Sequence, residues 1–288
     1  MRVMKQFAVF VLSVLGVCIS TTLYAVNIDV KILNNIIATA EYSKGERDKP
    51  AVILLHGFLQ THHFQTVNRL GSYLADEGYT VLAPTLTLGV SQRKKSLSCE
   101  AIHLHSMEDD QHEIDFWVRW LQSRGHTSIV LVGHSYGSLQ LLIYAANNKN
   151  PGVVRVIATS LVDIEYTIGR EKNKRQINNA MNMQQQNVDA LKNYQLNYCN
   201  KYVAPPAAFL SYAVWDKENV IKLLMRVSIP MHIIMGSKDN RADESWPAML
   251  RGAHADVLTV EGAGHFFDAE YEFDLVDSVM VLMKDVRP

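Results

Sequence analysis

From residue 51 onward, short apolar runs alternate with longer segments in which apolar residues recur every three or four positions. The runs have the length of buried β-strands, and the longer segments have the period of amphipathic helices. Strands are expected at 51–55, 79–83, 128–132, 153–158, 232–235 and 257–260, and helices at 64–76, 107–121, 139–147 and 271–283. This alternation predicts an α/β protein, with a mostly parallel sheet covered by helices on both faces.

The segment 162–225 interrupts this alternation. It contains no convincing strand, but its apolar residues fall mostly three or four positions apart: Ile177, Met181, Val188, Leu191, Tyr194 and Tyr198. We therefore expect a cap of helices inserted between two strands, with a break at Pro205-Pro206. The Asn- and Gln-rich stretch at 178–187 leaves a flexible low-complexity tract open as an alternative.

The first 25 residues have the composition of a secretory signal peptide. Arg2 and Lys5 precede an apolar run at 7–19, and a cleavage site follows at Ala25. An uncleaved membrane anchor remains an alternative, because the apolar stretch is almost long enough to span a bilayer. A lipoprotein signal at Cys18 is a second one. We expect the chain to be exported, to a periplasm or out of the cell.

The cysteines fit an exported chain. Cys18 lies in the leader, so Cys99 and Cys199 are the two that remain in the mature domain, 26–288. An oxidising compartment favours a disulfide between them. The sequence alone does not bring two cysteines within bonding distance.

The charge of the chain excludes some partners. The formal net charge is -1, and lysines and arginines are scattered rather than clustered. Neither nucleic acid nor an anionic membrane surface is therefore expected to bind. The sequence does not indicate an oligomeric state.

A serine between two glycines follows the strand expected at 128–132. The pentapeptide Gly133-His134-Ser135-Tyr136-Gly137 matches G-x-S-x-G, and a helix is expected soon after it. Strand, sharp turn and helix together form a nucleophile elbow, in which the serine has a strained backbone and small flanking residues avoid collisions. Ser135 is thus the candidate nucleophile.

A serine hydroxyl needs a base, and the base needs a third group to orient it. Asp239 follows the strand expected at 232–235, and His265 follows the strand expected at 257–260. Ser135, Asp239 and His265 each lie at the carboxyl end of a strand, where open α/β sheets build their sites. Asp243 and Asp163 are alternative candidates for the acid.

Four segments in this order make the sequence resemble the α/β-hydrolase superfamily, in particular its lipase-like and esterase-like members with a helical cap. They are LLHGF, GHSYG, GSKD and GAGHF, and the resemblance extends from residue 51 to the C-terminus. It implies the α/β-hydrolase fold and an oxyanion hole formed by the backbone N–H groups of Phe58 and Tyr136. The position of Tyr136 at a helix N-terminus independently favours an anion.

These residues predict acyl transfer to water, with a small-molecule ester or acyl compound as substrate and no cofactor. Aromatic residues near the elbow suit an apolar substrate group: Phe58, Phe64, Tyr136, Phe266, Phe267 and Trp215. Two alternatives stay open. The same triad serves peptidases, amidases and thioesterases, and the same fold can serve as a non-catalytic binding protein.

No metal site is expected. Several ligand-type residues follow one another along the chain, namely Cys99, His103, His105, Asp109, Asp110 and His112. They lack the compact spacing of metal motifs, and a polar loop leading into a helix accounts for them. His62 and His63 are interpreted as surface or cap-facing residues.

Overall fold

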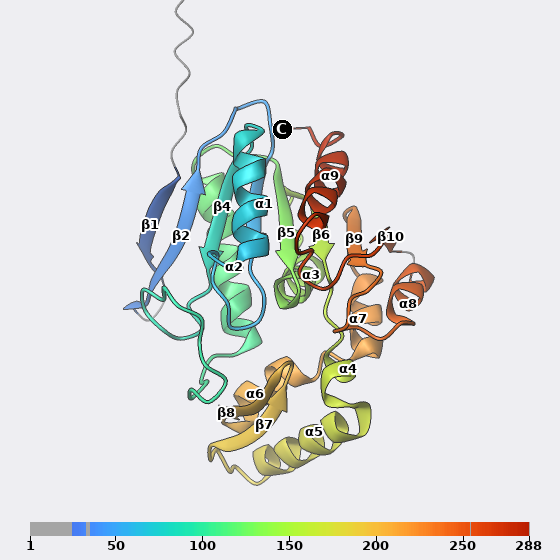
Figure 1. Cartoon of the computed structure of the whole chain (residues 1–288). Helices are drawn as coiled ribbons and strands as arrows, with labels where there is room; N and C mark the ends of the chain where they lie inside the picture. The colour runs from blue at the N-terminus through green and yellow to red at the C-terminus, as the bar shows by residue number, and fades with distance from the viewer. Residues whose placement is uncertain (1–24, 33–34, 254, 288) are drawn as a thin grey trace, which may run out of the picture.

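The computed structural model describes residues 25–32, 35–253 and 255–287. Its main sheet has the strand order β1-β2-β4-β3-β5-β6-β9-β10 (Figure 1). These strands are β1 Val26–Lys31, β2 Ile37–Ser43, β3 Ala51–Leu55, β4 Thr80–Thr85, β5 Ile129–His134, β6 Val153–Thr159, β9 Met231–Gly236 and β10 Asp256–Val260. Strands β4, β3, β5, β6, β9 and β10 run parallel to their neighbours in that order, whereas β2 is antiparallel to both β1 and β4. The expected mostly parallel sheet is confirmed.

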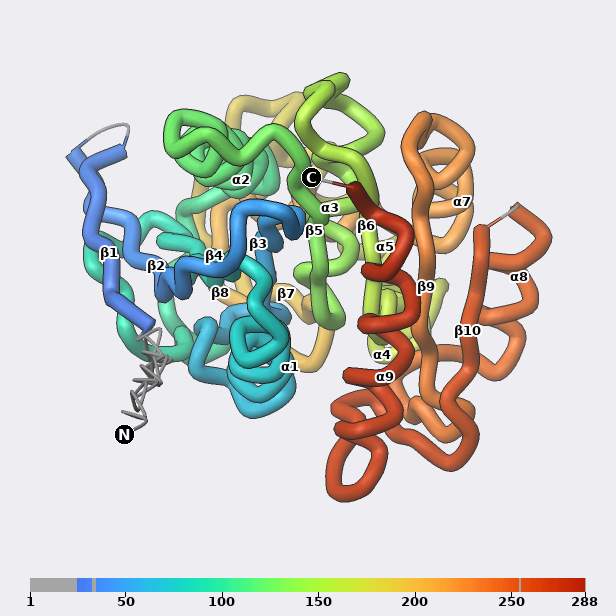
Figure 2. The backbone as a smooth tube through the Cα atoms, turned by 90° about the horizontal axis from the view of Figure 1, so that it is seen from above, coloured from blue at the N-terminus to red at the C-terminus, as the bar shows by residue number. Residues whose placement is uncertain are grey.

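Helices cover both faces of the sheet. Alternate residues of β3 and β5 face opposite layers: Val52 and Val130 pack in one apolar cluster, and Ile53 and Leu131 pack in the other. Helices α1 (Gln65–Asp76) and α9 (Tyr271–Met283) lie on the first face, and α2 (Met107–Gln122) and α3 (Tyr136–Asn147) lie on the second (Figure 2). Every residue of β3 is buried because both faces are covered.

Two strands and one helix lie outside the predicted pattern. Strand β1 is an edge strand with alternately exposed residues, and β2 mixes small and polar residues, so neither forms an apolar run. Helix α8 (Trp246–Gly252) has only seven residues, too few to display helical periodicity.

The segment between β6 and β9 differs from the purely helical cap that was expected. It contains helices α4 (Ile164–Ile168), α5 (Arg170–Gln185), α6 (Pro206–Ala213) and α7 (Lys217–Leu224), but also the antiparallel hairpin of β7 (Lys192–Leu196) and β8 (Cys199–Ala204). Tyr194 and Tyr198 have helical spacing, yet one lies in a strand and the other in the hairpin turn. The segment lies beyond the arrowheads of β5 and β6 (Figure 1). Pro206 is the first residue of α6, which fits the expected break.

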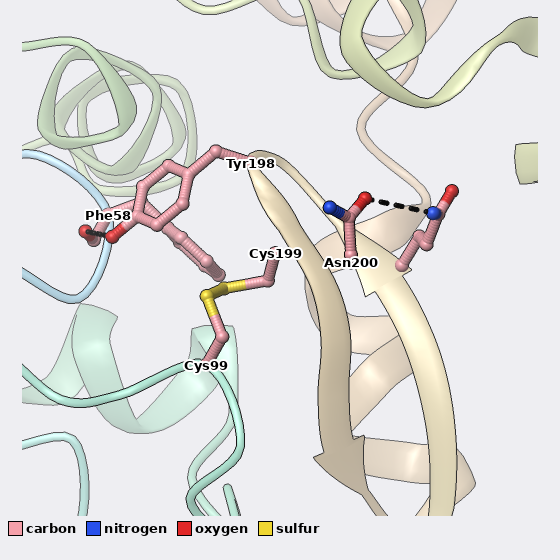
Figure 3. The surroundings of a disulfide bond; sticks show 6 residues. Phe58, Cys99, Tyr198, Cys199 and Asn200 are labelled. Carbon is pink, nitrogen blue, oxygen red and sulfur yellow. Dashed lines mark hydrogen bonds between the residues drawn. A yellow bond between two sulfur atoms is a disulfide. The ribbon is translucent and has the colours of Figure 1, made fainter.

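The predicted disulfide is present. Cys99, in the loop after β4, is bonded to Cys199 at the start of β8, with a Cα–Cα distance of 5.3 Å (Figure 3). The bond joins the hairpin to the main domain across 100 positions of sequence. Such a bridge indicates an oxidising, exported environment.

The expected leader, at 1–25, lies almost entirely outside the described residues. Within the described part of the chain, no helix is both long and apolar enough to cross a bilayer.

Candidate active site

Ser135 occupies the sharp turn between β5 and α3. Its backbone has φ 57° and ψ -119°, a left-handed conformation that is unfavourable for a residue with a side chain. Its N–H donates to the carbonyl of Thr159 at 2.8 Å, which anchors the turn to β6. The surrounding sheet maintains this strained conformation. The sharp turn places the Ser135 hydroxyl beyond the carboxyl ends of the strands.

The flanking glycines are required by close backbone contacts. A Cβ on Gly133 would lie 2.7 Å from the carbonyl carbon of Gly137, and a Cβ on Gly137 would lie 2.4 Å from the carbonyl oxygen of His56. Both distances are shorter than the contacts that Cβ atoms make in proteins. The atoms they would meet belong to the backbone, which cannot rotate away as a flexible side chain can. Gly137 therefore lets α3 begin directly against the end of β3.

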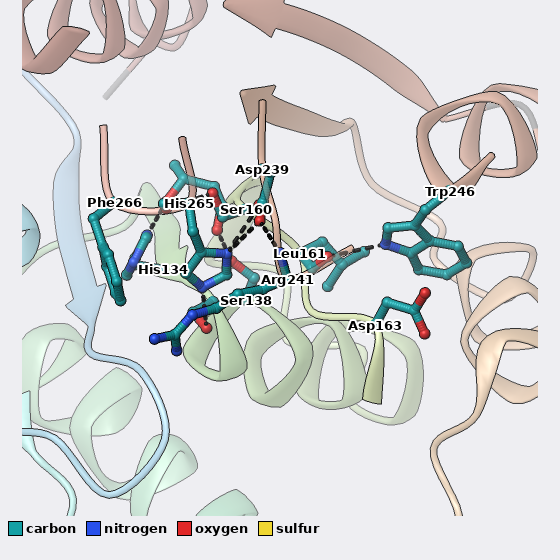
Figure 4. A network of polar contacts seen from close by, with 12 residues as sticks. His134, Ser138, Ser160, Leu161, Asp163, Asp239, Arg241, Trp246, His265 and Phe266 are labelled. Atoms are coloured by element: carbon teal, nitrogen blue, oxygen red, sulfur yellow. Dashed lines mark hydrogen bonds and ion pairs between the residues drawn. The ribbon is translucent and has the colours of Figure 1, made fainter. Parts of the chain in front are cut away.

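Three predicted residues meet at this turn. The Ser135 Oγ lies 2.9 Å from Nε2 of His265, and Nδ1 of His265 lies 2.9 Å from each carboxylate oxygen of Asp239. Because a carboxylate only accepts, Nδ1 carries the proton and Nε2 is free to accept from the serine. Figure 4 shows Asp239 and His265 joined by these contacts. Their side chains are each 3% exposed.

The loops that carry the acid and the base are fixed to each other. A Cβ on Gly236, at the end of β9, would lie 2.3 Å from the carbonyl oxygen of Ala263, so the two loops touch through their backbones. Ser160 Oγ donates to the carbonyl of His265 at 2.8 Å, and Lys238 N–H donates to Ala263 at 2.9 Å. Ser160 was not identified from the sequence, because its contact spans 105 positions.

The loop after β3 lies beside Ser135. A Cβ on Gly57 would be 3.4 Å from the Ser135 Cβ. His56 Nδ1–H donates to the Gly57 carbonyl at 2.8 Å, while its Nε2 accepts from the Leu86 N–H at 3.0 Å. A trans peptide directs its N–H opposite to its carbonyl, so this contact fixes the direction of the Phe58 N–H. Among the described residues, that N–H has no backbone partner.

His56 is a buried residue that holds the loop in place. It is 1% exposed, and burial, followed by the field of Arg93, lowers its pKa to about 3. His134 packs beside the elbow, and burial holds its pKa well below the ordinary value. Its ring centroid lies 5.4 Å from that of His265. A neutral His134 adds no positive charge next to the base.

The alternative acids are engaged elsewhere. Lys217 Nζ lies 3.3 Å from Asp163 and 3.5 Å from Asp243, and Asp163 also caps α4 by accepting from the Tyr166 N–H. Within the described part of the chain, Asp239 is the one carboxylate bonded to His265.

Side chains from three regions enclose the site. Tyr198, at the tip of the β7–β8 hairpin, donates through its hydroxyl to the carbonyl of Phe58 at 2.9 Å (Figure 3). The Arg241 guanidinium carbon lies 4.7 Å from the ring centroid of Phe266 and 5.6 Å from that of Tyr198. Ser135 is consequently only 6% exposed. Tyr198 and Arg241 were not among the predicted site residues, because no local pattern marks either of them.

The other aromatic candidates divide between site and core. Phe64 lies 5.3 Å from Phe266 between ring centroids, and Phe58 lies 5.0 Å from Tyr136. Phe267 is 1% exposed and packs in the apolar cluster beneath α1 and α9. Trp215 donates to the carbonyl of Ser211 within its own segment.

A buried acid lies behind the elbow helix. Asp110, 1% exposed on α2, accepts at Oδ2 from the Tyr212 hydroxyl at 2.6 Å and from Gln140 Nε2 at 2.7 Å. The Tyr212 hydroxyl in turn lies 2.6 Å from His105 Nδ1. Burial raises the pKa of Asp110 to about 8. Asp110 and His105 are thus joined through the Tyr212 hydroxyl, and Cys99 is bonded to Cys199.

Comparisons with known proteins agree with this architecture. A family model described as alpha/beta hydrolase fold matches residues 50–198, slightly more than half of the chain. DcsB, solved in complex with its substrate analogue, is 12% identical with a TM-score of 0.70, over 91% of this chain and 100% of that one. Est1E from Butyrivibrio proteoclasticus is 16% identical with a TM-score of 0.63, over 90% and 98%.

A Pyrococcus furiosus esterase is 14% identical with a TM-score of 0.64, over 92% of each chain. At these low sequence identities, the structural similarity shows a shared fold and nothing further. A search of curated protein sequences finds no match.

Proposed function

Because the chain belongs to the alpha/beta hydrolase fold family, we propose that it is an exported serine hydrolase that cleaves carboxylic esters. The observation that carries this proposal is the continuous hydrogen-bonded series from Ser135 through His265 to Asp239, at 2.9 Å for each contact. Fold alone does not fix function, but a buried and correctly ordered triad on a strained turn does support one chemistry.

The proposed reaction begins when Ser135 Oγ attacks the ester carbonyl and His265 Nε2 takes its proton. Asp239 keeps the imidazole in the required tautomer and stabilises the cation that forms. The protonated His265 then gives the proton to the leaving alcohol, and an acyl-enzyme remains on Ser135. Water, activated by the same histidine, releases the acid.

Two backbone N–H groups are proposed to hold the developing oxyanion. The Tyr136 N–H is in the first turn of α3, where N–H groups lack intrahelical partners. The Phe58 N–H is directed by the contact between His56 and Gly57. Losing one such donor in a comparable site costs on the order of 3 kcal/mol of transition-state stabilisation.

The surroundings favour an apolar acyl or alcohol group. The Phe266 ring lies 5.0 Å from the His265 ring and 5.3 Å from the Phe64 ring, measured between centroids. The Phe58 and Tyr198 rings lie 5.6 Å apart. Amide or thioester cleavage by the same triad is the nearest alternative. A peptidase that captures a free amino terminus needs an available acid, and Asp163 and Glu165 are already paired with Lys217 and Arg170.

Hydrolysis of a panel of esters, amides and thioesters with short, medium and long acyl chains tests this proposal. We expect ester cleavage that is lost in Ser135→Ala and retained in Ser278→Ala, a serine on the exposed side of α9. If the folded protein cleaves none of these compounds, the proposal is wrong and a non-catalytic binding role takes its place.

A further inference from the structure

We propose that Glu41, His62 and His63 form a binding site for a transition-metal cation, with Zn²⁺ as the expected ion. One ligand atom of each residue lies within 4.8 Å of the others, on the side of the molecule where β2 meets the loop before α1. Imidazole nitrogens with a carboxylate oxygen are a ligand set that Zn²⁺ accepts, and a water molecule can complete the tetrahedron.

His62 carries the main argument. It is only 6% exposed, so the sequence-based placement on the surface or the cap is wrong for this residue. Its Nε2 is buried and has no hydrogen-bond partner among the residues that the structure describes. A buried nitrogen without a partner is costly, because it has lost its bonds to water and gained nothing in exchange. A bound cation would satisfy it.

The other ring nitrogen is already oriented. His62 Nδ1 lies 2.6 Å from the Thr85 Oγ1, and the His62 backbone N–H donates to the same oxygen at 3.1 Å. Metal-binding histidines commonly use their second nitrogen in this way, which fixes the ring and leaves the first nitrogen facing the ion.

Glu41 and His63 complete the set from accessible positions. Glu41 is paired with Ala83 in the β2–β4 ladder, and with His62 it lines a cavity of about 150 Å³ that has room for water. No hydrogen bond or ion pair in the described part of the chain joins Glu41 to either histidine. The His63 ring is exposed, with its centroid 4.0 Å from that of His62, and it can turn toward an ion.

The site would tie β2 to the loop that carries Phe58 and then leads into α1. Zn²⁺ bound only by the folded chain would therefore raise its stability. The catalytic proposal does not depend on this ion, since Glu41 and both histidines are distinct from the triad.

Calorimetric titration of untagged, chelator-treated protein with Zn²⁺ tests the site, alongside Co²⁺ absorption spectra and the thermal midpoint. We expect one ion per chain, a tetrahedral Co²⁺ spectrum and a raised midpoint. Glu41→Gln and His63→Ala change accessible positions and should fold normally, and each should weaken binding by at least about tenfold. His112→Ala, a change at an exposed histidine of α2, should not.

The proposal is overturned if the wild-type protein takes up no Zn²⁺ or Co²⁺. It is also overturned if Glu41→Gln and His63→Ala both bind as tightly as the wild type. Ester hydrolysis measured on the same samples separates this result from the catalytic proposal.

Discussion

Replacing Asp110 by asparagine should change how stability depends on pH. In the folded chain the pKa of Asp110 is raised to about 8, mainly because the carboxyl is buried between α2 and α3, and the ordinary value is 3.8. Between these two values the folded protein holds a proton that the unfolded chain has released. The free energy of unfolding therefore falls as pH rises through this window.

One such proton corresponds to a slope of about 1.4 kcal/mol per pH unit, so between pH 5 and 7 this residue removes roughly 2.7 kcal/mol of stability. Asparagine cannot ionise, and its side-chain oxygen can still accept from Tyr212 and Gln140, which now bond Asp110. The difference in unfolding free energy between Asp110→Asn and wild type should thus grow in favour of the variant as pH rises.

Urea unfolding followed by tryptophan fluorescence at several pH values measures this difference. Glu108→Gln, which removes a carboxylate from an exposed position on the same helix, is the matched control. Because other titrating groups contribute equally to both proteins, they cancel in the comparison. A constant difference between Asp110→Asn and wild type from pH 5 to 8 would refute the reasoning. It would mean that the two donors keep Asp110 ionised.

Three further predictions concern the disulfide, the elbow and the acid. Replacing Cys99 and Cys199 together by serine opens a loop across 100 positions, and should lower the unfolding free energy by up to about 4.7 kcal/mol, measured by denaturation without reductant; an unchanged midpoint would contradict this. Gly137→Ala places a Cβ 2.4 Å from a carbonyl oxygen and should destabilise the fold by roughly 1–3 kcal/mol. Gly252→Ala meets nothing within 4 Å and should be neutral or stabilising, so similar midpoints for these two variants would be evidence against the packing argument. Asp239→Asn should reduce kcat for ester cleavage on the order of 10⁴-fold through the wrong histidine tautomer, and a loss of less than tenfold would remove Asp239 from the proposed triad.

Features that local sequence determines were predictable. The Ser135 turn was visible because a buried strand, two small residues and a helix follow one another within a few positions. Asp239 and His265 followed because parallel strands place their carboxyl ends at one edge, so chain order gives proximity. The disulfide was expected because two cysteines follow the leader-like segment, although the sequence did not show that they lie within bonding distance.

Features that depend on contacts between distant segments were not predictable. The β7–β8 hairpin was missed because Tyr194 and Tyr198 have helical spacing, and only the structure shows that one lies in a strand and the other in the turn. Tyr198 and Arg241 come from two different regions of the chain, and the guanidinium carbon lies 5.6 Å from the centroid of the ring. His62 bonds through Nδ1 to Thr85, 23 positions away, and its Nε2 is buried without a partner among the described residues. The periodicity of a sequence does not indicate which distant residues will contact each other.

The most direct test of the central claim is the intact mass of the mature protein after treatment with a fluorophosphonate, with Ser135→Ala treated alongside. An activated serine attacks this reagent, and neighbouring serines without a base do not. The account predicts a single adduct on the wild-type protein and none on Ser135→Ala. A folded wild-type protein that remains unlabelled, or a variant labelled as fully as the wild type, would contradict it.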